Sequence, residues 1–294
     1  MKRLPIQLRL RDGKTLSLGK RTLIMGILNV TPDSFSDGGR FFNFSAATKQ
    51  AEEMLSHGVD ILDIGGESTR PGSEGVPVEE ELRRVIPLVE TIKKRYDVLI
   101  SIDTVKGKVA NHAIEAGADI VNDISGFRMD SELLPIIVQK KVPVVVTHMK
   151  GVPRTMQANP VYEDVVQEVV FFLQETIQKA IMAGVEKDQI IVDPGIGFGK
   201  TKEHNWELIG KLNRLNELGS PVLMAASRKA FLRQLVKEIN CLEELFPMAP
   251  EVELASHAVA VSSVLKGAHI VRTHDVVGTK IAVAVADKIL DQGE

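Results

Sequence analysis

Polar and ionisable residues stand where short apolar runs of this chain end. In chain order they are Asn29, Asp63, Asp103, Asn122, Asp123, His148, Asp193, Ser227, Arg228, Lys229, Arg272 and His274. Asp103, Asn122 and Asp193 combine acceptors with an amide, which suits the edge of a flat, amino-substituted nitrogen heterocycle. Lys229, Arg272 and His274 supply positive charge, which suits an anion such as phosphate or carboxylate. The residue types therefore predict a heterocycle on one side of a site and an anion on the other.

Two segments beside these residues have the composition of loops that hold a ligand. Residues 28–39 are polar and contain paired glycines, and they exceed the roughly 2 to 6 residues that join a strand to a helix. Gly195 and Gly197 allow a close backbone approach, and Phe198 could stack on a ring. A nucleotide phosphate loop is not predicted at 195–201. That motif has four residues between its first glycine and the Gly-Lys pair, and this chain has three.

Each polar strand end also has a purely structural explanation. An Asp or Asn after a strand often caps the next helix, and this alternative stays open for Asp63 and Asp123. Thr104 could cap the helix that follows Asp103. Eight such endings that converge on one opening are harder to explain as caps. The seven histidines are scattered and form no zinc-binding pattern.

Eight short, β-rich apolar runs alternate with helical patterns along the chain. The runs are continuous, which is typical of parallel strands buried on both faces. They are Thr22–Leu28, Val59–Ile64, Val98–Ile102, Asp119–Val121, Val142–Val146, Gln189–Val192, Pro221–Met224 and Ala268–Val271. Ser45 is the expected N-cap of the first helix. Glycines at 58, 117 and 184 suit the C-terminal ends of three helices.

Eight β-α units without a linker predict an α/β fold, a (β/α)8 TIM barrel, with residues 1–294 as one domain. An open, doubly wound sheet is the alternative, although it rarely needs eight strands in one run. Gln7–Arg9 and Thr15–Ser17 predict an N-terminal β-hairpin, within residues 1–20, that caps the barrel. Asn240–Glu251 interrupts the seventh unit and predicts an extra helical insertion. Catalytic groups of such barrels lie at the carboxyl ends of the strands.

The composition limits the partners and the compartment. The 294 residues are 44% apolar, and 36 basic and 39 acidic residues give a net charge of −3. This balance gives no electrostatic footprint for nucleic acid or for an anionic membrane. The single cysteine, Cys241, excludes an internal disulfide and fits a reducing compartment. With no secretory signal and no apolar run of about 18 residues, we expect a soluble cytoplasmic protein.

Seven segments, spread from the first predicted strand to the last, carry a family resemblance. They are GILNVTPDSFSDGG (26–39), DIGGESTRPGS (63–73), SIDT (101–104), VNDISG (121–126), VDPGIGFGK (192–200), SRKAF (227–231) and VRTHDV (271–276). They resemble dihydropteroate synthases of folate biosynthesis. The resemblance implies a pterin-binding barrel that joins 6-hydroxymethyl-7,8-dihydropterin pyrophosphate to 4-aminobenzoate and releases pyrophosphate. It also implies Mg²⁺ as cofactor and a homodimer.

The resemblance further implies roles for single residues. Asp103, Asn122 and Asp193 are expected at the pterin edge. Lys229 is expected to bind the pterin near the aminobenzoate, Asn29 to bind Mg²⁺ and pyrophosphate, and Arg272 and His274 to bind pyrophosphate. Asp37, Thr69 and Arg70 are expected to make contacts from loops, and Phe35 and Pro71 to lie in the aminobenzoate pocket. Phe198 and Ser227 are the remaining expected substrate contacts. Ala230 stands where many members have Ser, so a hydroxyl contact to the aminobenzoate carboxylate is missing, and the backbone N–H there remains.

The expected chemistry is a dissociative alkyl transfer. Pyrophosphate leaves first, and Asp103 and Asp193 stabilise the cationic pterin methylene that remains. Arg272, His274 and Mg²⁺ on Asn29 stabilise the leaving group. The aniline nitrogen is already nucleophilic, so no strong general base is needed. Two alternatives stay open: a methyltetrahydrofolate–corrinoid methyltransferase, which needs no pyrophosphate anchors, and a pterin-binding paralogue without activity.

Overall fold

Eight parallel strands build the centre of the molecule. The computed structural model describes residues 3–30, 40–68, 73 and 75–292. In order along the sheet the strands are β8 (Ile190–Asp193), β7 (Val144–Thr147), β6 (Ile120–Asp123), β5 (Leu99–Asp103), β4 (Ile61–Gly65), β3 (Leu23–Asn29), β10 (Ile270–Thr273) and β9 (Leu223–Met224). A single parallel bridge between Val192 and Val222 joins the two edge strands. The sheet therefore closes into the predicted barrel, and the open doubly wound sheet is excluded.

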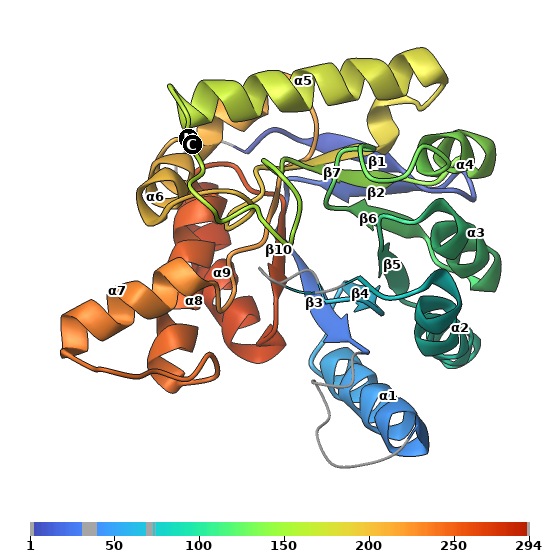
Figure 1. Ribbon diagram of the computed structural model, residues 1–294, viewed down its shortest axis with the longest axis horizontal. Coiled ribbons are helices and arrows are strands. Elements are labelled where there is room, and N and C mark those ends of the chain that lie inside the picture. The colour runs from blue at the N-terminus through green and yellow to red at the C-terminus, as the bar shows by residue number, and fades with distance from the viewer. Residues whose placement is uncertain (1–2, 31–39, 69–72, 74, 293–294) are drawn as a thin grey trace.

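Helices surround the strands on the outside, as Figure 1 shows. They are α1 (Arg40–Ser56), α2 (Val78–Arg95), α3 (Gly107–Ala116), α4 (Leu133–Lys140), α5 (Val165–Ala183), α6 (Lys202–Gly210), α7 (Ala230–Asn240), α8 (Pro250–Leu265) and α9 (Val276–Asp291), with short 3-10 helices η2 (Lys187–Gln189) and η3 (Leu212–Leu218). Helices and strands alternate through most of the chain, which gives the β-α units that the apolar runs predicted. None of the helices in the described ranges is long and apolar enough to cross a membrane.

The buried apolar side chains form two main layers. One layer lies between the strands and the helices and includes Leu62, Ile100 and Val146. A second cluster includes Met25 and Ile61 and draws on β3, β4, β6, β7, β8, β9 and β10 together. Side chains of a strand alternate between its two faces, so the second cluster fills the barrel interior. Continuous apolar strands supply both layers, which explains why the runs in the sequence did not alternate.

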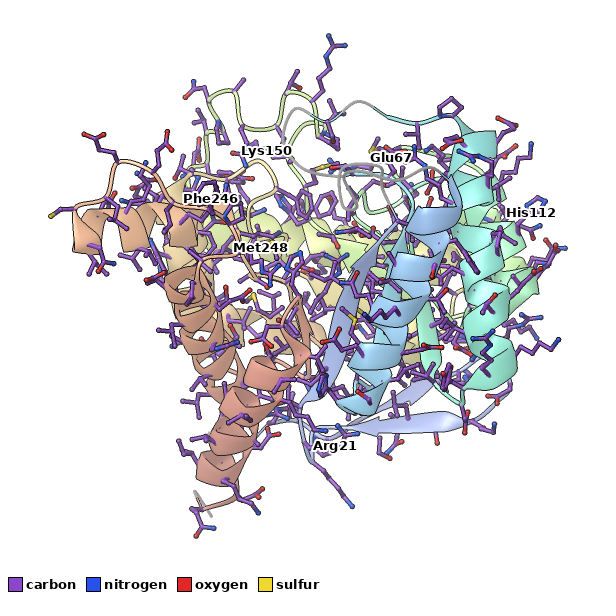
Figure 2. The ribbon with its side chains drawn as sticks, turned by 90° about the horizontal axis from the view of Figure 1, so that it is seen from below. Arg21, Glu67, His112, Lys150, Phe246 and Met248 are labelled. Atoms are coloured by element: carbon purple, nitrogen blue, oxygen red, sulfur yellow. The ribbon has the colours of Figure 1, made fainter. Side chains whose placement is uncertain are left out.

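The predicted hairpin closes one end of the barrel. Strand β1 (Ile6–Arg9) pairs antiparallel with β2 (Thr15–Leu18). Leu8 and Leu18 are buried and belong to the interior cluster. Figure 2 shows Glu67, just beyond β4, at the end of the molecule opposite Arg21, which precedes β3. The hairpin therefore covers the amino ends of the strands and leaves the carboxyl ends for the polar residues.

Two local predictions are wrong. Helix α1 begins at Arg40 and not at Ser45, because residues 40–44 contain no Gly or Pro that would delay the helix. Residues 241–249 contain no helix, so the extra helical insertion is absent. Cys241 ends α7 with a left-handed φ of 53°, and Pro250 fits the first turn of α8, where a missing backbone N–H costs nothing.

Candidate active site

The register of four neighbouring strands brings predicted site residues into one row. Asn29 pairs with Gly65, Gly65 pairs with Asp103, and Asp103 pairs with Asn122. A Cβ at Gly65 would lie 3.4 Å from the Cβ of Asp103 and 3.5 Å from Oδ1 of Asn29. Glycine therefore places no side chain between Asn29 and Asp103 at the carboxyl end of the barrel.

Arg272 joins two carboxylates from different strands. Its Nε donates to Asp63 Oδ2 at 2.6 Å, and its Nη2 donates to Asp103 Oδ2 at 2.7 Å. Asn122 Nδ2 donates to the same oxygen of Asp63 at 3.1 Å. Asp63 is fully buried, so water screens these contacts little. Asp63 thus holds Arg272 and Asn122 in place, and the alternative that it serves as a helix cap is wrong.

Several buried oxygen atoms at this end of the barrel make no hydrogen bond with the described residues. Burial raises the pKa of Asp103 to about 7, although Arg272 acts in the opposite direction. Asp103 Oδ1, Asp63 Oδ1 and Thr147 Oγ1 are buried and have no hydrogen-bond partner among the described residues. A buried polar atom without a partner costs free energy. These atoms therefore keep hydrogen-bonding capacity that the described residues do not use.

The loop after β8 packs tightly against the end of β7. Asp193 Oδ1 accepts a hydrogen bond from Gly195 N at 2.6 Å. Burial raises the pKa of Asp193, and Lys229 opposes this effect. Gly195 has a φ of +69°, and a Cβ there would lie 1.8 Å from the carbonyl oxygen of His148. The close approach predicted at Gly195 is thus made to the protein's own β7 end.

Lys229 reaches from the start of α7 to this same loop. Its Nζ donates to the carbonyl oxygen of Ile196 and lies 4.4 Å from the centre of the Phe198 ring. The negative face of an aromatic ring attracts a cation at this distance. Burial lowers the pKa of Lys229 to about 8, against the effect of Asp193. The structure therefore brings Lys229, Phe198 and Asp193 together, although the residue types alone grouped Lys229 with the cations and Asp193 with the acceptors on the opposite side.

Ser227 and His274 form a second contact between strand ends. Ser227 Oγ lies 3.0 Å from His274 Nδ1, and His274 N donates to Ser227 Oγ at 3.2 Å. This contact joins the turn after β9 to the turn after β10. Arg272 instead contacts Asp63 and Asp103, so the two predicted pyrophosphate residues have different partners.

An apolar cluster lies beside the polar groups. Ile124, Met149 and Met156 are buried together, with Val105 and Phe198 packed against them. Val105 and Ile124 line a small cavity that Asp103 also lines. An apolar wall beside a few convergent polar groups is typical of a small-molecule site. Sequence reasoning missed this cluster, although most of its members lie just beyond strand ends.

A buried lysine–histidine pair holds the loop after β8. Lys200 Nζ lies 2.8 Å from His148 Nδ1 and donates to the Phe198 carbonyl oxygen at 3.1 Å. Burial, together with Lys200, lowers the pKa of His148 to about 2. Burial also lowers the pKa of Lys200 well below its usual range. His148 therefore serves as a neutral acceptor, and the Gly-Lys pair that resembled a phosphate loop has a structural role.

Two other strand-end residues shape local turns. Asp123 accepts hydrogen bonds from Ser125 N at 2.8 Å and from Phe127 N at 2.6 Å, so it stabilises a turn. The N-cap of the next helix, α4, is Glu132, and the alternative that Asp123 caps this helix is therefore wrong. Thr104 Oγ1 accepts from Lys106 N at 3.2 Å. The N-cap of α3 is Lys106, which makes no side-chain cap, so the prediction that Thr104 caps this helix is wrong.

The remaining predicted contacts fall within residues 31–39 and 69–72. Phe35, Asp37, Thr69, Arg70 and Pro71 lie outside the described residues. Their implied roles stay predictions.

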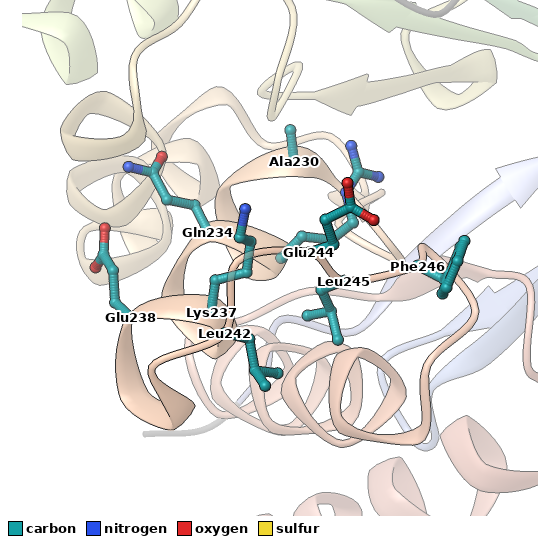
Figure 3. A pocket seen from close by; sticks show the side chains of 9 residues that line it. Ala230, Gln234, Lys237, Glu238, Leu242, Glu244, Leu245 and Phe246 are labelled. Atoms are coloured by element: carbon teal, nitrogen blue, oxygen red, sulfur yellow. The ribbon is translucent and has the colours of Figure 1, made fainter.

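A hollow of about 650 Å³ runs along α7 and the segment that follows it. Ala230, Gln234 and Lys237 of α7 line this hollow together with Leu242 and Phe246, as Figure 3 shows. Ala230, which directly follows Lys229, contributes only a methyl group to this lining. The lining includes none of the carboxylates that contact Arg272, so the hollow is distinct from the row of strand-end residues.

Asn29 is suited to share a magnesium ion with a substrate. Mg²⁺ takes oxygen ligands and, in phosphate sites, usually one or two from the protein and the rest from water and phosphate. The Asn29 side-chain oxygen lies next to the position that Gly65 leaves without a side chain. One amide oxygen fits such a shared site but cannot form a cage made of protein ligands alone.

Comparisons with known proteins identify the family of this chain. Residues 25–274 match the family model described as pterin binding enzyme. A curated dihydropteroate synthase of Synechocystis sp. is 43% identical over 278 residues, which cover 94% of this chain and 93% of the relative. The structure of the Yersinia pestis dihydropteroate synthase in a sulfonamide drug complex has a TM-score of 0.88 and 40% identity, covering 97% of this chain and 99% of that one. The Xanthomonas albilineans enzyme in complex with 7,8-dihydropteroate has a TM-score of 0.82 and 40% identity, covering 96% and 98%. The chain therefore belongs to the pterin binding enzyme family and, within it, to the dihydropteroate synthases.

Proposed function

We propose that this protein condenses 6-hydroxymethyl-7,8-dihydropterin pyrophosphate with 4-aminobenzoate to form 7,8-dihydropteroate and pyrophosphate. The observation that carries the proposal is the group in which Arg272 joins Asp63 to Asp103 while Asn122 binds Asp63. This group presents acceptors, an amide and a cation at one barrel end. A pterin edge and a diphosphate need these same partners.

The pterin edge is expected to lie against Asp103, Asn122 and Asp193. Asp103 Oδ1 has no partner among the described residues, so it can accept an N–H of the aminopyrimidinone. Each of the three side chains is nearly fully buried, and hydrogen bonds to charged acceptors are strong in such surroundings. The apolar cluster of Ile124 and Met149 would cover a face of the ring.

The diphosphate is expected to lie near Arg272 and His274. Among the described residues the guanidinium uses Nε and Nη2 for the two carboxylates, and its third nitrogen, Nη1, is the one proposed to bind the anion. Mg²⁺ bound by Asn29 and phosphate oxygens would neutralise part of the charge of the leaving group. Arg272 thereby stands between the carboxylates that hold the pterin and the anion that leaves.

The transfer itself is proposed to be dissociative. The bond from the pterin methylene carbon to the bridging oxygen breaks first, and both bonding electrons leave with pyrophosphate. Asp103 and Asp193 then stabilise the cation, and a well-placed charged group of this kind contributes roughly 3 kcal/mol. The aniline nitrogen attacks the carbon, a C–N bond forms, and the nitrogen then gives up its proton to solvent water. Lys229, held over Phe198, places its charge where the aminobenzoate is expected.

A direct assay tests the proposal. The purified protein, given pterin pyrophosphate, radiolabelled 4-aminobenzoate and Mg²⁺, should form labelled dihydropteroate and release one pyrophosphate for each product. Lys229→Ala and Asp193→Asn should each lose most of the turnover, about 100-fold or more. Near-normal turnover in either variant would contradict the assigned roles.

The same preparation separates the two alternatives. Methyl transfer from methyltetrahydrofolate to a corrinoid, without dihydropteroate formation, would indicate the corrinoid methyltransferase. Pterin pyrophosphate binding in calorimetry without either reaction would indicate a binding paralogue. The intact Lys229 and the Arg272 ion pairs favour the synthase.

Calorimetry also tests the magnesium proposal without any turnover. Pterin pyrophosphate should bind more tightly with Mg²⁺ than with EDTA. In Asn29→Ala the gain from Mg²⁺ should shrink, while a pterin without a diphosphate should bind as it does to the unchanged protein. If Mg²⁺ increased the affinity equally in both proteins, Asn29 would not be a magnesium ligand.

A second copy of this chain is the proposed partner for the outer face of α9. Val277, Ile281, Val285 and Ile289 are four residues apart and are 42%, 66%, 55% and 53% exposed. Residues at this spacing share one helix face, and contiguous exposed apolar surface marks interaction sites. The family resemblance also implies a homodimer, and we place the protein in the cytoplasm.

Sedimentation velocity tests the proposed dimer. Ile281→Asp should convert a dimer into a monomer. Met182→Asp on α5, where Met182 is 88% exposed, is the matched control and should leave the sedimentation coefficient unchanged. A monomer in the unchanged protein at micromolar concentration would rule out the proposal.

A further inference from the structure

The residue before Lys229 has an unusual backbone conformation. Arg228 has a φ of +57°, in the left-handed region that residues with a side chain rarely adopt. Such a conformation persists where the surrounding structure holds it, and it is frequent at functional sites. Here it makes the sharp turn between Ser227, which contacts His274, and Lys229, which contacts the loop after β8.

Helix α8 holds this residue from one face. Ser256 Oγ accepts from Arg228 N at 3.1 Å and donates to the Val252 carbonyl oxygen at 2.8 Å. Glu253 forms an ion pair with Arg228 Nε. Glu253 and Ser256 are three residues apart and so lie on the same side of the helix. The backbone N–H and the guanidinium of Arg228 are therefore both fixed by one helix.

The same face of α8 reaches the turn after β10. His257 Nε2 lies 2.9 Å from Asp275 Oδ2, and Asp275 caps α9 through Gly278 N at 3.0 Å. Glu253, His257 and Asp275 have ligand atoms within 4.8 Å of one another. The guanidinium of Arg228 already supplies a cation beside Glu253. We therefore interpret Glu253, His257 and Asp275 as residues that fix the turns after β9 and β10, and not as a metal site.

We propose that Glu253 and Ser256 are positioning residues that hold Arg228 in its left-handed conformation and thereby keep Lys229 in the active site. The inference rests on the proposed dihydropteroate synthase function. Neither residue contacts Lys229 directly in the described structure. Their effect on the reaction must therefore pass through the backbone of Arg228, which is what an experiment can isolate.

Two variants and two matched controls test the inference. Ser256→Ala removes the acceptor of Arg228 N, and Ser263→Ala removes a hydroxyl on the same helix that donates to the Val259 carbonyl oxygen at 2.7 Å. Glu253→Gln removes the charge that pairs with Arg228, and Glu251→Gln changes an exposed residue two positions earlier. Thermal unfolding of all four proteins separates loss of stability from loss of positioning.

The expected result is a loss of kcat without a matching change in pterin affinity. Ser256→Ala and Glu253→Gln should lower kcat at least tenfold, since small misplacements of a catalytic group have effects of this order. Both controls should stay within about twofold. Reductive methylation of Lys229, followed by mass spectrometry against pH, should report its pKa. That pKa, about 8 in the unchanged protein, should rise in the two variants only.

A double-mutant cycle gives the decisive comparison. Glycine adopts a positive φ without help, so in an Arg228→Gly background the loss of the Ser256 hydroxyl should cost much less kcat than it does alone. Equal losses in both backgrounds, or unchanged kcat and Lys229 labelling in Ser256→Ala and Glu253→Gln, would overturn the inference. Absence of dihydropteroate formation by the unchanged protein would instead overturn the proposed function. If Glu253→Gln does not fold, Glu253→Asp replaces it. This variant keeps the charge but shortens the side chain, so its kcat should lie between that of the unchanged protein and the tenfold lower value.

Discussion

Replacing Arg272 by Met should destabilise the folded protein, because it leaves two buried carboxylates, Asp63 and Asp103, without their cation. Arg272 lies 2.6 Å from Asp63 and 2.7 Å from Asp103, and Asp63 and Asp103 are 0% and 6% exposed. Methionine keeps much of the side-chain volume and removes the charge. Removing one partner of a buried ion pair typically destabilises a protein by about 3 to 5 kcal/mol. We expect a loss in this range at pH 8.

The loss should depend on pH in a defined direction. The pKa of Asp103 is about 7 even with Arg272 present, so the folded state holds this proton more strongly than the unfolded chain does. Its contribution to stability is present at low pH and is lost as pH rises through the folded pKa. Without Arg272 the pKa rises further. The variant therefore stays protonated where the unchanged protein ionises, and the stability deficit should be about 1.4 kcal/mol larger at pH 8 than at pH 6.

Urea-induced unfolding, followed by circular dichroism at both pH values, measures this deficit. Arg83→Met is the control, because Arg83 is exposed and pairs with Glu80 on the surface of α2, where such pairs contribute less than about 1 kcal/mol. Adding Asp103→Asn to Arg272→Met should recover part of the lost stability. A deficit below about 1 kcal/mol at pH 8, or one that is equal at pH 6 and pH 8, would refute the reasoning.

Three further predictions concern the loop after β8 and the pterin site. Gly195→Ala should destabilise the protein by about 3 kcal/mol in urea unfolding, because the new Cβ would lie 1.8 Å from the His148 carbonyl oxygen. Gly13→Ala is the control. No atom lies within 4 Å of its Cβ, so it should cost only about 1 to 2 kcal/mol. The pKa of Lys200 is lowered by burial, so the folded state binds fewer protons than the unfolded chain. The stability of the unchanged protein relative to Lys200→Met should therefore rise between pH 7 and pH 9.5, and a flat difference in urea unfolding would contradict the burial of this charge. A pterin without a diphosphate should bind about tenfold more weakly at pH 6 than at pH 8 in calorimetry, because protonated Asp103, with a pKa of about 7, loses an acceptor.

Much of the fold was readable because its signals are local. Continuous apolar runs predicted parallel strands, and the strands lie where those runs are. The barrel and its hairpin followed from their number and order. Local rules failed at Ser45 and at 240–251, where a helix start and a loop depend on how the neighbouring chain continues and not on one favourable residue type.

The site was predictable in its residue types and less so in its partners. Asp103, Asn122, Asp193 and Lys229 meet at the carboxyl end of the barrel because parallel strands bring their ends together. The role of Asp63 could not be separated from a helix cap, since its partner Arg272 lies 209 positions away. The sequence likewise carries no local sign that Lys200 would be buried against His148.

The closure between β8 and β9 has a consequence for motion. β9 has two residues, and one bridge, Val192 to Val222, completes the cylinder there. This seam lies below Asp193 on one side and the turn that carries Lys229 on the other. Local opening is easiest where few hydrogen bonds must break, so opening at the seam would separate Asp193 from the turn that carries Lys229. Ligands that contact both sides of the seam should hold the two strands together. Their binding should therefore slow amide hydrogen exchange most in β8 and β9.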